Sequence, residues 1–228
     1  MINIFILFIL VVHFKFYLTY LNSLTDSIIL NNIARRYKIR KIDVLKRILK
    51  FLYKNICFIT SFWSIKKELE KDVWSISYDI VDKYTNYLEN AFLTIKTQIF
   101  SFRTKNILQW YYKFYSYDTG ILNSYTNSFD IEKNLENLIF LEILRRNWKP
   151  ISIKTPNFEI DFFDENNKIY YQITYSIKNQ KTFERETKWL LNLKDSYPKY
   201  ILTLDEIEKD YKWIKIINII DFLINTNL

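Results

Sequence analysis

The chain changes its hydrophobic period along its length, which predicts helices in its first part and strands further on. From Asp26, apolar residues recur every three or four positions, the spacing of one face of an α-helix. Asp43 can cap a helix, and the apolar face of that helix consists of Leu45, Ile48, Leu49 and Leu52. Two further helices fit Ser64 to Lys71 and Ser77 to Phe92.

Alternating apolar and polar residues then predict two strands, Leu93 to Phe102 and Asn106 to Tyr117, around the turn Arg103-Thr104-Lys105. Three helices followed by a strand pair predict a winged helix over residues 26–122. We expect the polar stretch 123–130 to be a linker and residues 131–228 to form a second domain. Residues 1–25 are expected to form an apolar helix ahead of the winged helix.

The second domain is organised around a predicted β-hairpin between Asn157 and Ser176. A helix over Leu135 to Arg146 precedes the hairpin. An amphipathic segment, Gln180 to Leu193, and a strand, Lys199 to Thr203, follow it. These elements predict an α-β-β-β-α-β order, and the whole chain is expected to be an α+β or α/β protein.

Asn166-Asn167 is predicted to form the two-residue turn of the hairpin, because asparagine tolerates positive φ. This register pairs Asp161 with Gln172 and Glu159 with Thr174, so these four side chains share one open face of the sheet. Near the turn that face also carries Phe163 and Tyr170. The opposite, core face carries Phe158, Ile160, Phe162, Ile169, Tyr171 and Ile173.

This order of elements, with acids on the first helix and the hairpin, resembles the PD-(D/E)XK nuclease fold. The resemblance makes Glu136 the helix acid and Asp161 the motif aspartate, and puts Gln172-Ile173-Thr174 where (D/E)-x-K belongs. A working site of this kind binds Mg²⁺ through carboxylates and orients the attacking water with its lysine. Glu136, Glu159 and Asp161 are therefore candidate Mg²⁺ ligands. Gln172 is a weaker ligand than glutamate, and Thr174 supplies no cation.

Three functions remain open at this point. Because the motif lysine is missing, the first is a non-catalytic nucleic-acid-binding or regulatory domain with a degenerate nuclease-like fold. The second is a metal-dependent DNA nuclease with an altered motif. The third is a protein module that docks on a separate ATPase. The first and third would not be enzymes.

Four segments narrow the resemblance: LENLIFLEILRR, EIDFF, IYYQITYSI and YPKYILTLDEI. They resemble the C-terminal domain of unknown function in predicted archaeal and bacterial AAA-type ATPases. Members of that family join a P-loop ATPase, a winged-helix segment and this nuclease-like domain in one chain. The resemblance runs from about Tyr17 to the end, and it implies an ATPase domain or chain as a partner. Since no ATPase domain is recognisable, the chain is expected to be truncated, with residues 1–25 as a remnant or replacement of the ATPase part.

Composition excludes several kinds of site. Gly120 is the only glycine, so neither a P-loop nor a G-x-G-x-x-G turn can be present. His13 is the only histidine and Cys57 the only cysteine, which argues against Ser-His-Asp chemistry and against a His-Cys zinc site. Cys57 has apolar neighbours and is expected to be a buried thiol in the reducing cytoplasm. The apolar run Ile2 to Val12 is shorter than the ~20 residues that span a bilayer, so a membrane is not an expected partner.

Positive charge is concentrated in the first part of the chain. Residues 1–130 hold 18 Lys and Arg against 10 Asp and Glu, whereas residues 131–228 hold 15 of each. Such a cluster favours contact with nucleic-acid phosphates without sequence preference. The helix Ser77 to Phe92 carries three acids and one lysine, which disfavours base reading by that helix. A solvated basic face and a surface that docks on an ATPase are the alternatives. The candidate nucleic-acid contacts are Arg35, Arg36, Arg40, Lys46, Arg47, Lys50, Lys54, Lys96, Arg103 and Lys105.

Overall fold

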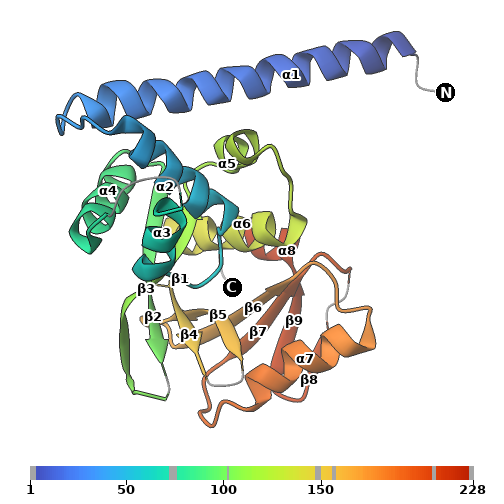
Figure 1. Cartoon of the computed structure of the whole chain (residues 1–228). Coiled ribbons are helices and arrows are strands. Elements are labelled where there is room, and N and C mark those ends of the chain that lie inside the picture. Colours follow the sequence, from blue (N-terminus) through green and yellow to red (C-terminus); the bar gives the residue numbers. More distant parts are fainter. Residues whose placement is uncertain are drawn as a thin grey trace. The chain divides into compact units, whose positions relative to one another are not determined.

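The computed structural model describes residues 4–71, 76–101, 103–146, 150–155, 158–206 and 209–225, with side chains from Phe16 onward (Figure 1). The chain divides into two compact units. Unit 1 consists of Met1–Ile56, Thr60–Ile95 and Ser116–Phe129, and unit 2 consists of Cys57–Ile59, Lys96–Tyr115 and Asp130–Leu228. Helices and a sheet with parallel and antiparallel strands make up the described residues, which confirms the predicted mixed α and β class.

Unit 1 is mainly helical. Its elements are α1 (Ile4–Ser27), the π-helix η1 (Ile28–Ala34), α2 (Ile42–Lys54), the short strand β1 (Thr60–Ser61), α3 (Phe62–Leu69), α4 (Tyr78–Asn90) and α5 (Thr119–Thr126). Ser61 and Ser77 begin α3 and α4, because their hydroxyl oxygens accept backbone N–H groups of the first turn. The predicted apolar face of α2 is fully buried, and α2, α3 and α4 pack on one another. The three predicted helices are therefore present, with two corrections to their starts. The N-cap of α2 is Lys41 and not Asp43, and α3 begins at Phe62 and not at Ser64.

Residues 4–25 of the predicted apolar segment 1–25 fall within α1, while residues 1–3 and the side chains up to Lys15 lie outside the described part of the chain. Among the described helices, none combines the length and apolar character needed to cross a membrane. The C-terminal part of α1 packs against α5, where the Ser124 hydroxyl donates to the Leu18 carbonyl at 2.8 Å. A Cβ atom at Gly120 would lie 2.9 Å from the Tyr17 hydroxyl oxygen, so the single glycine permits this close approach.

The predicted wing strands are present as β2 (Thr94–Ser101) and β3 (Asn106–Ser116), but most of both strands belongs to unit 2. In β2, Ile99 lies opposite Ser152 in a parallel pairing with β4. Ile99, Phe114 and Tyr115 are completely buried, so the hairpin gains more from the large sheet than from standing alone as a wing. The predicted boundary at residue 122 therefore does not separate the two units. The predicted linker 123–130 begins inside α5.

Unit 2 is a sheet covered by helices. Its remaining elements are α6 (Ile131–Arg145), β4 (Pro150–Lys154), β5 (Glu159–Asp164), β6 (Ile169–Thr174), α7 (Gln180–Leu191), β7 (Lys199–Thr203), β8 (Lys209–Tyr211), β9 (Ile214–Asn218) and α8 (Ile219–Ile224). The strands run in the order β3-β2-β4-β5-β6-β7-β9-β8 (Figure 1). From α6 to β7, the predicted α-β-β-β-α-β order is confirmed.

Two aromatic residues that follow each other on β6 show how helices cover both faces of this sheet. Tyr170 belongs to a core with Leu190 of α7, whereas the Tyr171 ring lies 5.7 Å from the Phe222 ring of α8. Successive residues of a strand point to opposite faces, so α7 and α8 cover different faces. Helices therefore cover both faces, and the open face predicted for the hairpin is wrong at Gln172 and Thr174. Gln172 and Thr174 are only 4% and 3% exposed.

The predicted register of the hairpin is confirmed at its three paired positions. Phe162 lies opposite Tyr171, Phe163 opposite Tyr170 and Asp164 opposite Ile169. The turn is longer than the predicted Asn166-Asn167 pair, because the pairing ends at Asp164. The Asp164 carboxylate accepts the backbone N–H of Asn166 and the side-chain amide of Asn167, and Lys168 takes the positive φ of 58°.

A bulge in the pairing of β4 with β5 breaks the predicted alternation. Ile151 lies opposite Phe163, but Ile153 lies opposite Ile160, so one extra residue is accommodated on β5. Ile160 consequently packs in the α7 core, while the Phe162 ring lies 5.8 Å from Phe140 of α6. The prediction of one shared core face for Ile160 and Phe162 is wrong for this reason.

Candidate active site

A buried lysine from β3 lies among the three predicted acids of unit 2. The Lys113 Nζ atom is 2.6 Å from Glu159 Oε1, 2.8 Å from Glu136 Oε1 and 3.7 Å from Asp161 Oδ1. The lysine side chain is 1% exposed, while those of Glu136, Glu159 and Asp161 keep 16%, 27% and 13%. The structure thus brings the three predicted acids together around a cation that the hairpin motif lacks.

Packing of β3 against α6 places Lys113 at this point. Lys113 and Tyr115 are two residues apart, so both point to the same face of the strand. The Tyr115 ring stacks on Phe140 at 3.8 Å, and the Tyr115 hydroxyl donates to Glu136 Oε1 at 2.9 Å. Glu136 and Phe140 are four residues apart on α6, which puts them on one side of that helix. The same contact that buries the tyrosine ring therefore holds Glu136 against Lys113.

Asp161 is held by the end of the hairpin. Its Oδ2 atom accepts the backbone N–H of Ile173 at 2.9 Å, and its own N–H points to Gln172 Oε1 at 3.4 Å. The Ser152 hydroxyl donates to the Asp161 carbonyl at 3.0 Å. Next to the bulge, side chains thus take over hydrogen bonds that a regular strand pair would make through its backbone. This arrangement directs the Oδ1 atom of Asp161 toward Lys113.

Burial and mutual charge set the protonation of this cluster. Burial opposes the charge of Lys113, but the surrounding carboxylates outweigh burial and raise the pKa of the ammonium well above its usual value. Burial raises the pKa of Glu136, and it raises the pKa of Asp161 well above its usual value, with the Glu136 charge adding to the shift. Lys113 is therefore a fixed cation, and burial makes Glu136 and Asp161 weaker acids than exposed carboxyl groups.

The cluster opens into a cavity of about 320 Å³ within unit 2. Gln172 lines this cavity, whereas Thr174 does not, and Thr174 donates instead to the Ser176 carbonyl at 3.5 Å. From α7 the cavity receives Glu186, which is 2% exposed and whose Oε2 atom has no hydrogen-bond partner among the described residues. The Arg185 guanidinium donates to its other oxygen. Burial raises the pKa of the Glu186 carboxyl.

Cys57 is confirmed as a buried thiol at the edge of this cavity. Its Sγ atom lies 3.5 Å from the Lys133 carbonyl, and its N–H donates to the Phe114 carbonyl at 3.0 Å. Burial raises the pKa of the thiol well above its usual value, so Cys57 is neutral and unsuited to nucleophilic attack. It fixes the neighbouring segment to β3 and α6.

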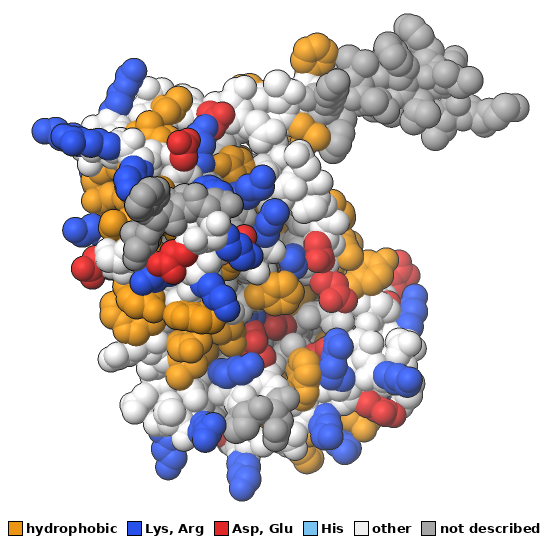
Figure 2. Space-filling model, in the orientation of Figure 1, with side chains coloured by type: hydrophobic (Ala, Val, Ile, Leu, Met, Phe, Trp, Pro, Cys, Tyr) orange, Lys and Arg blue, Asp and Glu red, His pale blue; other side chains and the backbone are white. Residues whose placement is uncertain are grey.

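The predicted nucleic-acid contacts fall into two groups. Those in unit 1 are Arg35, Arg36, Arg40, Lys46, Arg47, Lys50 and Lys54, and those in unit 2 are Lys96, Arg103 and Lys105. Figure 2 shows basic side chains on the visible face interspersed with acidic and hydrophobic ones. Lys46 is engaged by Asp26 at 2.6 Å, and Lys96 lies over the Tyr112 ring at 5.0 Å. Arg103 and Lys105 are exposed between β2 and β3.

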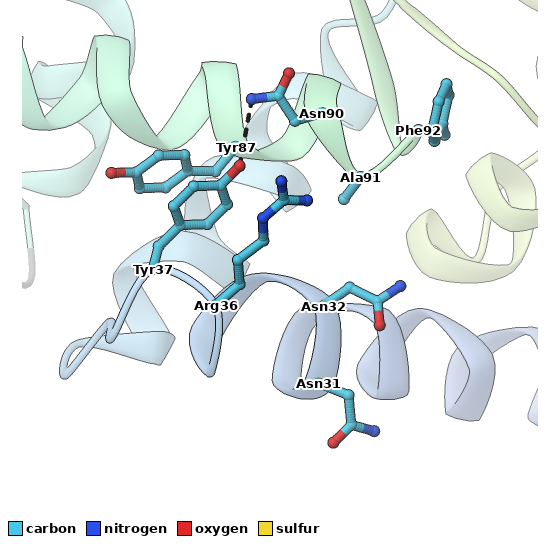
Figure 3. Close-up of a pocket in the computed structure, with 8 residues that line it drawn as sticks. All are labelled: Asn31, Asn32, Arg36, Tyr37, Tyr87, Asn90, Ala91 and Phe92. Carbon is cyan, nitrogen blue, oxygen red and sulfur yellow. Dashed lines mark hydrogen bonds between the residues drawn. The ribbon is translucent and has the colours of Figure 1, made fainter.

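Unit 1 contains a separate cavity of about 420 Å³ beside η1 and the end of α4. Figure 3 shows the Arg36 guanidinium extending over the Tyr37 ring, which stacks on Tyr87 at 3.7 Å. The Asn90 amide donates to the Tyr37 hydroxyl at 3.4 Å. Among the described residues that line this cavity there is no Asp or Glu, so they offer no carboxylate comparable with those around Lys113.

Sequence reasoning missed Lys113 because the search for a lysine was confined to the neighbourhood of the hairpin. A signal was present: Lys113 is a single charge among the aromatic residues of YYKFY. A lysine in a strand whose neighbours are buried needs an acidic partner, since burying an unpaired ammonium is costly. Glu186, which contributes to the cavity from α7, was missed in the same way.

Comparison with other proteins gives relatives but no solved structure that matches. An uncharacterized protein of Haemophilus influenzae is 30% identical over 211 residues, covering 90% of this chain and 52% of that protein. The uncharacterized protein MJ1544 of Methanocaldococcus jannaschii is 34% identical over 179 residues, covering 74% of this chain and 38% of that protein. The chain therefore spans about half or less of the length of these relatives.

A family model described as a domain of unknown function, DUF8612, matches residues 14–132. The matched segment includes the helices α2, α3 and α4 and the hairpin that carries Lys113. Since this match takes in half of the chain, the protein belongs to the DUF8612 family.

Proposed function

We propose that unit 2 is a divalent-metal-dependent nuclease domain whose essential lysine comes from β3 instead of from the hairpin motif. The observation that carries this proposal is the position of the Lys113 Nζ atom, 2.6 to 3.7 Å from the carboxylates of Glu136, Glu159 and Asp161. The non-catalytic interpretation rested on the missing lysine at Thr174. Lys113 removes that objection.

The donor set suits Mg²⁺, which prefers oxygen ligands and binds through one or two carboxylates and water. Glu136, Glu159 and Asp161 would hold the ion, and the Glu186 Oε2 atom without a partner is a further oxygen in the same cavity. Such an ion would polarise a phosphate and lower the pKa of a bound water. A cation bound here would compete with the Lys113 ammonium for the carboxylate oxygens.

Lys113 would act through its charge. A general base must be deprotonated near the working pH, and the surrounding carboxylates, which raise the pKa of Lys113, favour its charged form instead. A fixed ammonium in a dry site instead stabilises negative charge that develops on a phosphate during attack by water. Before a phosphate binds, the three acids stabilise the charged form of Lys113 and hold its ammonium in position.

Cleavage of labelled single-stranded and duplex DNA in Mg²⁺ or Mn²⁺ tests the proposal. Lys113→Met and Glu136→Gln should each lower the initial rate by roughly 10²- to 10⁴-fold. Glu142→Gln is the matched control, because Glu142 is a buried acid on the same helix that pairs with Arg145 and does not line the cavity. Absence of cleavage by the unmodified chain with both metals and both substrates would reject the proposal.

A non-catalytic binding domain is the second candidate, and the position of Lys113 also gives a reason for it. The ammonium itself can serve as the cation of the site, and the described residues contain no group of three acids, histidines or cysteines already arranged to hold a metal. Calorimetry with Mn²⁺ separates the two functions. Binding by the unmodified chain that is lost in Glu136→Gln supports the nuclease. If Mn²⁺ binds to the Lys113→Met variant but not to the unmodified chain, the Lys113 ammonium occupies the cation position and the non-catalytic function is supported.

For unit 1 we propose contacts with nucleic-acid phosphates, supported by its exposed arginines and lysines. The resemblance to AAA-type ATPase chains supports an ATPase domain or chain as a second partner. Co-migration of the chain with a separately produced P-loop ATPase on size exclusion would test that partner. A mixture that elutes as two separate species at micromolar concentration would argue against it.

A further inference from the structure

Two aromatic rings with adjacent cations line the same cavity as the carboxylates of unit 2. The Phe58 ring is 55% exposed, and the Lys133 Nζ atom lies 4.6 Å from its centre. The Trp189 ring is partly exposed, and the Arg185 Cζ atom lies 5.4 Å from its centre. The cavity therefore combines acids, a fixed lysine and two ring–cation pairs.

Both rings are held by the fold. Phe58 follows Cys57, which is fixed to β3 by the hydrogen bond from its N–H to the Phe114 carbonyl at 3.0 Å. Trp189 precedes Leu190, a completely buried residue of the α7 core, and lies nearly parallel to the Phe158 ring at 6.3 Å. The anchors are buried and both aromatic residues line the cavity, so the rings are preorganised for contact with a ligand.

We infer that this cavity takes single-stranded nucleic acid, with unpaired bases stacked on Phe58 and Trp189 beside the scissile phosphate. The inference rests on the nuclease function proposed above and names its substrate class. Aromatic rings with neighbouring cations are the usual platform for unpaired bases, because every base has a π-face. In a duplex these faces are covered by the neighbouring base pairs, so the rings would have no surface to stack on.

The cations on this platform contribute little net charge. Lys133 lies 3.8 Å from Asp130, and Arg185 lies within hydrogen-bond distance of Glu186. Binding by this cavity should therefore depend mainly on stacking and only weakly on salt. With at most two phosphate contacts, the slope of log affinity against log salt is about −1.4 for a single strand.

Anisotropy and cleavage measurements test the inference together. The probes are a fluorescent oligothymidylate, an oligouridylate of the same length and a duplex. Binding is measured in the Asp161→Asn variant, whose side-chain oxygen can still accept the Ile173 N–H. Cleavage is measured in the chain that retains Asp161. Phe58→Ala and Trp189→Ala should each weaken single-strand binding roughly 5- to 150-fold and leave duplex binding unchanged. Trp189→Phe, which keeps a ring, should restore most of the affinity.

Trp213→Ala is the matched control, because Trp213 is 66% exposed in unit 2 but does not line the cavity. Cleavage of duplex and single strand at equal rates, both unaffected by Phe58→Ala, would overturn the inference while leaving the nuclease function intact. Stacking-dependent binding without any cleavage would instead reject the nuclease and keep the binding site. Comparison of the two oligonucleotides shows whether the strand is DNA or RNA.

Discussion

Lys113 of β3 and Glu159 of β5 form an ion pair with 2.6 Å between Nζ and Oε1, although β2 and β4 lie between their strands in the sheet. The pair brings together the two halves of the candidate site, since Glu159 is the first residue of β5 and Lys113 lies near the end of β3. Its loss should affect both stability and chemistry.

Lys113→Met should destabilise unit 2, because it leaves carboxylates buried without their cation. Breaking a buried ion pair costs about 3–5 kcal/mol in the free energy of unfolding. Urea denaturation followed by circular dichroism measures the loss. Lys133→Met is the comparison, since Lys133 is more exposed and should cost at most about 1 kcal/mol. Equal effects of the two changes would contradict this account of Lys113.

The cost of Lys113→Met should depend on pH. In the folded chain, burial raises the pKa of Asp161 and Glu136 above the usual carboxyl value near 4. A folded state that binds more protons than the unfolded state loses stability as pH rises. The Lys113→Met variant should therefore be most stable near pH 4, and its free energy of unfolding should decrease as the pH rises above that value. A variant that gains stability between pH 5 and pH 8 would contradict the raised pKa values.

Asp195 should show the opposite pH dependence. Burial opposes its ionisation, but hydrogen bonds from Tyr170, Lys199 and the Tyr197 N–H outweigh burial and lower its pKa. Its contribution is present above the usual carboxyl pKa and disappears as pH falls through the lowered value. Asp195→Asn should cost about 1.5–3 kcal/mol at pH 7. The difference from the unmodified chain in urea denaturation should shrink below about pH 4.

Transplanting the motif lysine into the hairpin should fail. Thr174 is 3% exposed and does not line the cavity of the three acids, so Thr174→Lys would bury an ammonium away from those acids. We expect a loss of several kcal/mol and a large fall in the melting temperature. Thr174→Val, which keeps the shape, is the control and should cost about 1 kcal/mol. A stable Thr174→Lys chain would show that this face of the sheet is more open than the structure indicates.

Unit 1 should bind duplex DNA weakly and with strong salt dependence. Replacing the exposed Lys50 and Lys54 with Glu should abolish this binding, and each lost phosphate contact should reduce the log–log salt slope by about 0.9. Lys212→Glu with Lys215→Glu makes the same charge change in unit 2 and is the control. Equal loss of DNA binding in both double variants would mean that binding depends on the net charge of the chain and not on the surface around Lys50 and Lys54.

Much of the secondary structure follows from the sequence alone. The apolar stripe of α2, Ser77 at the start of α4 and the strand Lys199–Thr203 are all local signals, and the structure places them as expected. The start of α3 was predicted less well, because its N-cap is Ser61 and not Ser64. The hairpin register was also predictable, because period-two alternation leaves few ways to pair the two strands.

Tertiary structure alone decided which faces are buried and which residues meet. The bulge opposite Ile151 and Ile153 changes the direction of Asp161 and Phe162. The bulge arises from pairing with β4, which the local pattern of β5 does not reveal. The hairpin of β2 and β3 looked like an independent wing, yet pairing of Ile99 with Ser152 joins it to the sheet of unit 2. Lys113 reaches Glu136 and Asp161 only because of that pairing. Contacts between distant segments depend on the whole core, so the lysine of this site could not be located from the spacing of the motif.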